Sequence, residues 1–158
     1  RYNKSSSGKK AFLEIYSSEP SKKILKQIEI KGASKYCGYI NQEQLKRILN
    51  ECDIPVHVES FDRKSIESTR LSVSTKIPEY LSLGKPVLAI GPKEVASMRF
   101  LESSALCISN PNDTFKQIKR LFDDEKFINV LSNKSKNKFI KIKDNEVKFK
   151  SIIDKLSN

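Results

Sequence analysis

The sequence has no tryptophan, one histidine and three cysteines, and only five glycines and six prolines among its 158 residues. So little glycine and proline excludes collagen-like and Gly/Pro-rich low-complexity chains. No apolar run approaches the roughly 18 residues of a membrane-spanning helix. His57 and the scattered Cys37, Cys52 and Cys107 cannot be assembled into a metal site or a Cys/His nucleophile, and His57 is expected as a core or edge histidine within a strand. We therefore expect no metal, no resident cofactor and reduced thiols in a cytoplasmic protein.

The length fits one compact domain. Residues 1–10 are polar and rich in serine and lysine, which predicts a flexible arm, and residues 11–158 are expected to form the domain. The chain begins with Arg1 rather than methionine, so we expect a piece of a longer protein.

The net charge of +11 is concentrated at the two ends of the chain. Residues 1–35 and 126–158 each carry nine basic and three acidic residues, whereas residues 36–125 carry twelve and thirteen. Basic surfaces attract nucleic acids, anionic bilayers or phosphorylated ligands. Lysine dominates and the phenylalanines from residue 115 to 139 follow helical, core-like spacing, so nucleic-acid binding is disfavoured. A weak contact with the anionic inner face of a membrane fits better.

Apolar patterning predicts strands that alternate with helices. The strands are expected over residues 11–16, 36–40, 53–58, 86–90 and 105–109. Helices are expected from Pro20, over 42–51 behind an Asn41 cap, from Ser74 or Thr75 to Gly84, and over 93–101, 112–122, 125–140 and 145–156. Residues 60–73 are expected as a loop, with or without a helical turn. This alternation predicts an α/β, Rossmann-like parallel sheet with helices on both faces and a ligand site beyond the carboxyl ends of the strands.

Residues 71–92 carry the clearest functional signal. They predict a polar loop, a short helix, a Gly84-Lys85-Pro86 turn and a buried strand. Amides of residues 73–77 at a helix start favour a phosphate, Lys76 adds a positive charge, and Glu79 is placed to accept two ribose hydroxyls. The alternative from the residues alone is structural, because acids are favoured at helix starts and lysine stems cover apolar surface.

The stretch STKIPEYLSLGKPVLA (Ser74–Ala89) resembles the S-x-K-x-x-E-Y-L-x-x-G-K-P signature of retaining glycosyltransferases of the GT-B fold. Upstream, YCGYI (36–40) is similar to that family's glycine turn after a strand, and DIPVHV (53–58) to a later strand. The resemblance spans about residues 11–140 and implies the C-terminal, nucleotide-binding half of such an enzyme, with its first strand missing. It implies that Glu79 binds the ribose of the donor. The resemblance implies two further groups of donor contacts. The loop that meets the diphosphate and sugar comprises Ser72, Val73, Ser74, Thr75 and Lys76. The segment that lies against the base comprises Gly38, Tyr39 and Ile40.

The sequence departs from the family pattern at two places. Leu71 stands where many relatives carry a second glutamate, and no equivalent exists for the family's opening glycine loop and Arg/Lys pair. The resemblance implies a hexosyltransferase-type fragment for polysaccharide biosynthesis. It would bind a UDP- or GDP-sugar and be inactive alone, with a glycan or lipid-linked acceptor held by the missing half. The alternatives are a non-catalytic Rossmann-like binding module and a basic module that binds nucleic acid or a membrane surface. The sequence leaves open the donor sugar, the acceptor and the stereochemical outcome.

Overall fold

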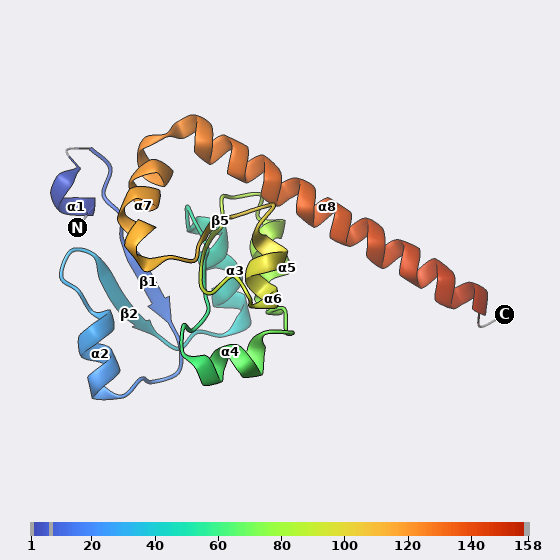
Figure 1. The fold of residues 1–158 in the computed structure, drawn as a ribbon, viewed down its shortest axis with the longest axis horizontal. Helices are drawn as coiled ribbons and strands as arrows, with labels where there is room; N and C mark the ends of the chain where they lie inside the picture. Colours follow the sequence, from blue (N-terminus) through green and yellow to red (C-terminus); the bar gives the residue numbers. More distant parts are fainter. Residues whose placement is uncertain (1, 7, 157–158) are drawn as a thin grey trace.

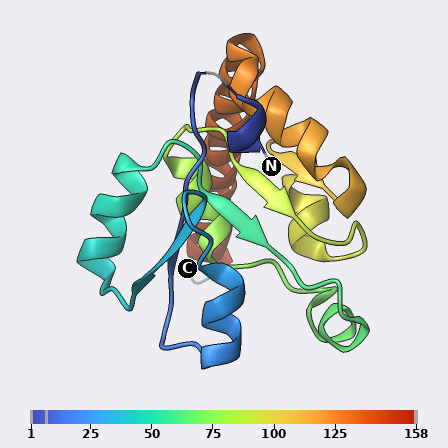
Figure 2. The ribbon, with the colours of Figure 1, turned by 90° about the vertical axis from the view of Figure 1, so that its left-hand side faces the viewer.

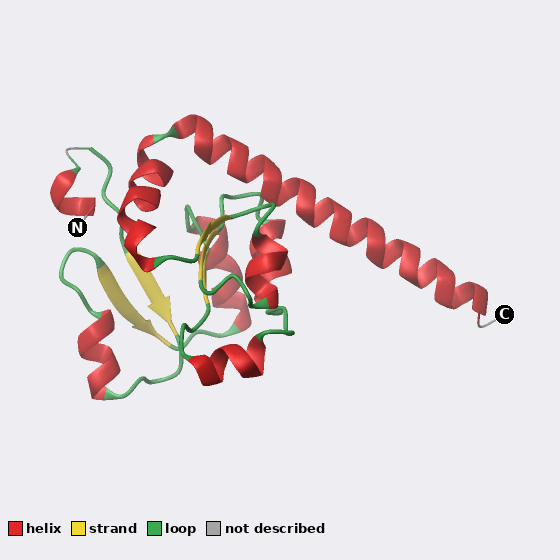
Figure 3. Cartoon of the chain, in the orientation of Figure 1, coloured by secondary structure: helices red, strands yellow, loops and turns green. Residues whose placement is uncertain are grey.

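The computed structural model describes residues 2–6 and 8–156, and it has a Rossmann-like α/β fold in which helices surround two small parallel sheets (Figures 1 and 3). The strands are β1 (Leu13–Tyr16), β2 (Ser34–Gly38), β3 (Val56–Val58), β4 (Leu88–Ile90) and β5 (Leu106–Ile108). The helices are α1 (Tyr2–Ser5), α2 (Lys22–Ile28), α3 (Gln42–Glu51), α4 (Arg63–Thr69), α5 (Lys76–Ser82), α6 (Ala96–Leu101), the 3-10 turn η1 (Pro111–Asp113), α7 (Thr114–Asp123) and α8 (Glu125–Leu156).

The strands form two sheets rather than the single expected one. β1 pairs in parallel with β2, and a second parallel sheet has the order β3-β4-β5. Figure 2 shows the arrows of β3 and β4 side by side. Apolar patterning identifies strands but does not choose their neighbours, which is why the separation was not predicted. The resemblance also implies a family strand ahead of β1 that is missing from this chain, and this implication stays a prediction.

The sheet β3-β4-β5 separates two apolar clusters because side chains alternate between the faces of a strand. One face packs against α7 and the start of α8, in a cluster built on Leu88, Leu106, Ile108, Leu121 and Leu131. The other face packs against α5, α6 and the middle of α8, in a cluster built on Ile77, Leu81, Val87, Ala89, Val95, Met98, Leu101 and Ala105. The sheet is thus covered by helices on both faces, as expected.

Local signals set several element ends. The Asn41 side chain accepts from the Gln44 amide and the Gln44 side chain accepts from the Asn41 amide, both at 2.9 Å, so the predicted capping box is confirmed. Gly84 ends α5 with a φ of 61°, which glycine adopts without strain. The next residue, Lys85, donates to the carbonyls of Leu49, Asn50 and Cys52 at the end of α3, so this lysine of the motif joins its turn to another helix.

The first residues differ from the expected flexible arm. Tyr2–Ser5 form α1, and the Tyr2 ring is buried and stacks on Phe122 with ring centroids 5.2 Å apart. The Tyr2 hydroxyl donates to Asp123 at 2.9 Å. Arg1 and Ser7, which also belong to the expected arm, and residues 157–158 of the expected domain lie outside the described residues.

Two further segments differ from expectation. The expected loop over residues 60–73 contains α4, whose start is capped by the Asp62 carboxylate accepting from the Ser65 amide at 3.1 Å. The two helices expected over residues 125–140 and 145–156 form the single helix α8. No glycine or proline occurs between residues 125 and 156, so nothing in the sequence ends the helix there.

Candidate functional site

A cavity of about 300 Å³ lies beside β3 and the start of α5. β3 is an edge strand, so its residues reach the cavity from both sides of the strand. The lining combines three serines, one threonine, one lysine and a His–Glu pair with two valines and a tyrosine, and it is more polar than apolar. The residues that line it are Val56, His57, Val58, Glu59, Thr69, Ser72, Ser74, Lys76, Tyr80 and Ser97.

His57 and Glu59 form a hydrogen-bonded pair in the wall of this cavity. They lie two residues apart on a strand, so both side chains project from the same face. The His57 ring, only 7% exposed, makes its contact through Nε2, 2.9 Å from Oε1 of the largely buried Glu59 side chain. With the carboxylate ionised, and so only an acceptor, this contact requires a proton on Nε2. A polar pair therefore takes the place of apolar side chains on this face.

Gly91 makes room for this pair. The backbone continues the ladder beyond the strands, because the Glu59 amide donates to the Ile90 carbonyl at 2.8 Å. A Cβ atom added to Gly91 would lie 2.7 Å from Glu59 Cβ and 3.2 Å from Met98 Sδ. The absence of a side chain at position 91 allows Glu59 to pack across β4.

The buried Ser97 of α6 holds the loop that precedes α5. Its Oγ accepts from the Ser74 amide at 3.1 Å and donates to the Ser72 carbonyl at 3.3 Å. Both ends of the Ser72–Ser74 segment are thereby fixed against α6. This arrangement explains why Ser72 and Ser74, both predicted donor contacts, lie together in the wall of the cavity.

The backbone amides ahead of α5 are less available than the sequence pattern indicates. Besides the Ser74 amide, the Ile77 amide donates to the Ser74 carbonyl and the Lys76 amide to Ser74 Oγ. α5 also has only seven residues, so its dipole is short. An anion in this cavity would be bound mainly by side chains, and Lys76 is the lysine that lines it.

Lys76, Glu79 and Tyr80 lie on neighbouring parts of α5. Lys76 and Tyr80, four residues apart, face the cavity, while Ile77 and Leu81 are fully buried in the core. Glu79 lies at the edge of this face, half-buried, and is not part of the lining. Burial and then the nearby Glu79 charge raise the pKa of Tyr80, so its hydroxyl stays protonated at neutral pH.

The other predicted contacts are placed elsewhere. Val73 and Thr75 are exposed and do not line the cavity, although they lie between residues that do. Gly38, Tyr39 and Ile40 follow or end β2 in the other sheet and are also outside its lining. Tyr39 is 78% exposed, as a stacking surface for a ring would be. The structure thus brings Ser72, Ser74 and Lys76 together in one cavity. It leaves Gly38, Tyr39 and Ile40 outside that cavity, at the end of β2 in the other sheet.

Sequence reasoning missed Glu59, Ser97, Thr69 and Tyr80 as parts of the cavity. The available signal was the H-x-E spacing of residues 57 and 59 at the carboxyl end of a strand, which places two polar side chains on one face. His57 is buried in a strand, as expected, but it is paired across the cavity wall rather than surrounded by apolar core. Ser97 carries no signal, because its role comes from a contact 23 residues away in the chain.

The arrangement suits a polar, hydroxylated and anionic ligand. Lys76 offers a cation, Glu59 offers an acceptor for hydroxyl donors, and the serine hydroxyls can both donate and accept. Among residues 2–6 and 8–156, no three His, Cys, Asp or Glu side chains converge as a metal site would require. A scan against models of known protein families and a search of curated proteins find no match to this chain.

Proposed function

We propose that this chain is the donor-binding part of a glycosyltransferase that uses a nucleotide-diphosphate sugar. The observation that carries the proposal is the position of the motif residues Ser74 and Lys76 together with Ser72 in one polar cavity beside the carboxyl end of β3. Parallel α/β folds bind ligands at this edge. The resemblance of Ser74–Ala89 to the GT-B signature supports the same class of ligand.

The diphosphate, the ribose and the sugar of the ligand each have a candidate partner. The Lys76 ammonium would contact the diphosphate, and Glu79, three residues further along α5 and outside the cavity lining, would accept the two ribose hydroxyls. Glu59, steadied by His57, would accept hydroxyls of the sugar. Catalysis would then rest on positioning the sugar and stabilising the departing diphosphate, with the acceptor supplied by other parts of the full-length protein.

The proposed location is the cytoplasm. The three cysteines are free, as expected of a reducing compartment. Within the part of the chain that is described, no helix has the length and apolarity to cross a bilayer.

One observation favours binding without transfer as a second function. Leu71, which occupies the position of the family's second glutamate, is 79% exposed and lies outside the cavity lining. A panel of sugar nucleotides assayed with the full-length protein separates the two functions, because only a transferase consumes a donor.

Titration of the chain with UDP, GDP and inorganic pyrophosphate, followed by amide chemical shifts, tests the proposal. Replacing Lys76 by glutamine should weaken both nucleotide and pyrophosphate binding by about tenfold, because it removes a charge-assisted hydrogen bond. Glu79→Ala should weaken nucleotide binding to a similar degree and leave pyrophosphate binding intact, because pyrophosphate has no ribose.

Lys93→Gln is the matched control, since Lys93 is exposed close behind β4 but does not line the cavity. It should change either affinity less than twofold. Equal losses from Lys76→Gln and Lys93→Gln would show attraction to the net charge alone and would contradict the site. Nucleotide binding that is indifferent to Glu79→Ala would remove the ribose assignment.

A further inference from the structure

Helix α8 changes character along its length. Its first half packs on the domain: Ser135 Oγ donates to the Ser104 carbonyl at 3.1 Å, and the Lys138 ammonium lies 4.3 Å from the centre of the Phe100 ring. Phe139 and Ile142 are the last α8 residues that pack against the core. Beyond them every described side chain is exposed, and Figure 1 shows this part of the helix projecting away from the body.

The apolar stripe of the packed part is interrupted by Asn145 and Glu146 and resumes at Phe149 on the projecting part. Phe149 follows Ile142 by seven residues, or two helical turns, so it lies on the same side of the helix. Its ring is 65% exposed, whereas Ile142 is half-buried against the core. An aromatic side chain on the stripe without a partner among the described residues indicates a surface that something else covers.

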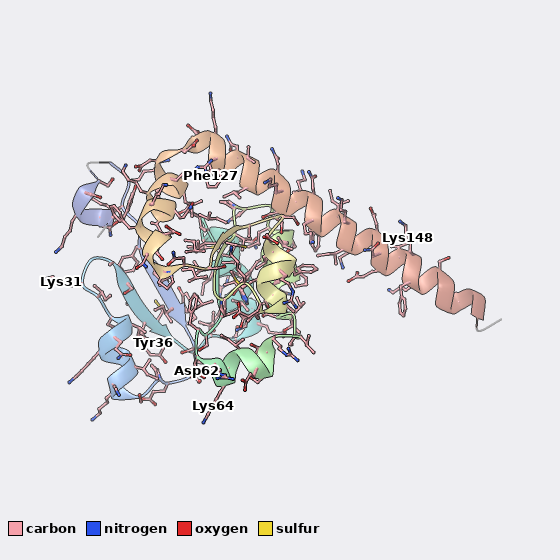
Figure 4. All side chains as sticks on the ribbon, viewed as in Figure 1. Lys31, Tyr36, Asp62, Lys64, Phe127 and Lys148 are labelled. Carbon is pink, nitrogen blue, oxygen red and sulfur yellow. The ribbon has the colours of Figure 1, made fainter. Side chains whose placement is uncertain are left out.

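Lysines border this stripe on both sides. Lys141 and Lys148 are seven residues apart along one flank, and Lys143 and Lys150 repeat the pattern along the other. Figure 4 shows Lys148 on the projecting part of α8, far from the sheets. An apolar stripe between two rows of lysines is typical of helices that lie in the interface of an anionic bilayer, with the apolar face down and the ammonium groups at the level of the lipid phosphates.

The charge of the segment specifies the partner. Residues 141–150 carry four lysines and two acids, a net charge of +2. A neutral bilayer would not compensate this positive charge, whereas anionic lipid headgroups do. RNA would also match the charge, but phosphates do not bury a phenylalanine at the centre of an aliphatic stripe.

We propose that the projecting part of α8, from Lys141 to Lys150, is an interfacial anchor that binds the surface of an anionic bilayer. The occupant of the Phe149 side is lipid. Lys141, Lys148 and Lys150 bind lipid phosphates, while Lys143 is paired with Glu146 at 2.8 Å. This inference is independent of the proposed donor site, because it uses no residue of the cavity.

Sedimentation of the chain with vesicles tests the proposal. We expect binding to vesicles of equal parts phosphatidylcholine and phosphatidylglycerol, and little binding to phosphatidylcholine alone. The pair Lys148→Gln and Lys150→Gln should weaken binding about 25-fold, at roughly fivefold per charge. The pair Lys22→Gln and Lys23→Gln on α2 makes the same change in net charge elsewhere and should weaken binding less than about threefold.

The apolar contact has its own matched pair of variants. Phe149→Ser should weaken vesicle binding about tenfold because a buried aromatic group is lost. Val147→Ser should have little effect, because Val147 is 68% exposed but lies on the opposite side of the helix. The sequence has no tryptophan, so Phe149→Trp adds a single reporter whose emission should shift to the blue with anionic vesicles, whereas Phe12→Trp beside β1 should not respond.

Three results would overturn the proposal. These are equal losses from Phe149→Ser and Val147→Ser, equal losses from the two lysine pairs, and poly(U) RNA binding that is lost with the α8 lysines while anionic vesicles stay unbound. Circular dichroism of each variant should match that of the parent chain, so that a loss of binding reports the surface and not unfolding.

Discussion

The two faces of the β3-β4-β5 sheet are built from the same three strands but differ in the polarity of their side chains. The row of register partners Val56, Leu88 and Leu106 faces an apolar layer closed by Leu121 of α7. The next row, His57, Ala89 and Cys107, faces the other way. Both faces thus pack an apolar cluster, and the second also carries a buried polar pair at its edge strand.

This difference in polarity indicates which residues contribute mainly to stability and which can also contribute to ligand binding. The apolar face gains free energy from close packing along its whole length. On the other face the small residues Ala89 and Gly91 admit the His57–Glu59 pair, and a hollow is left beside the edge strand. A substitution in the layer around Leu121, which does not line the cavity, should therefore affect folding alone, whereas one beside the His57–Glu59 pair should affect both.

The largest effect is expected from Leu121→Ala. Leu121 is fully buried in the apolar layer, so its truncation should lower the free energy of unfolding by about 3 kcal/mol. Urea denaturation measures this loss, while pyrophosphate or UDP binding to the remaining folded protein should be unchanged. As a control, Leu71→Ala at an exposed site should alter stability by less than about 0.5 kcal/mol. A loss of ligand affinity in Leu121→Ala would show that the two faces are coupled.

A smaller loss of stability, accompanied by a change in the cavity, is expected from Gly91→Ala. The new Cβ would approach the first side-chain carbon of Glu59, which cannot rotate away, so the backbone or Met98 must shift at a cost of about 1–3 kcal/mol. Ring chemical shifts of His57 should report disruption of its pair with Glu59. Gly8→Ala is the control, because nothing lies within 4 Å of a Cβ at that position. An unchanged His57 spectrum in Gly91→Ala would contradict the assigned packing.

The smallest effect is a pH dependence from Cys107. Burial, and then the charge of Glu102, raises the pKa of this thiol to about 11 from its usual 9.0. The folded chain holds the proton more tightly than the unfolded chain, so this contribution to stability is complete below pH 9 and is lost as the pH rises from 9 toward 11. Urea denaturation across this range should show a steeper decline for the parent than for Cys107→Ala. Parallel curves would show that the thiol does not contribute.

The elements themselves follow from local chemistry. Asn41 with Gln44, Gly84 with its positive φ, and the apolar run before Gly91 are signals carried by a few neighbouring residues. Helix α4 was missed because Ile66 is its one residue that packs against the core, which leaves no apolar period to detect. The division into two sheets depends on which strands become neighbours, and no local pattern encodes that choice.

The candidate site was predicted in part for the same reason. Lys76, Ser72 and Ser74 lie within one continuous motif, so their proximity follows from the sequence. Glu59 reaches the cavity because β3 lies parallel to β4, and Ser97 because α6 packs beside the loop before α5. These contacts join segments that are distant in the chain. The motif also concealed a structural role, since Lys85 binds the end of α3 rather than a ligand.

Because α8 is a single unbroken helix, it fixes the distance between the core and its own C-terminal end. From residue 143 to residue 156 the helix extends about 20 Å beyond its last contact with the core, at roughly 1.5 Å per residue. Without glycine or proline it works as a rigid spacer rather than a tether. Any surface that its far end touches is therefore held at a set separation and angle from the cavity beside β3, so a change in the length of α8 would move that surface relative to the cavity without altering either one.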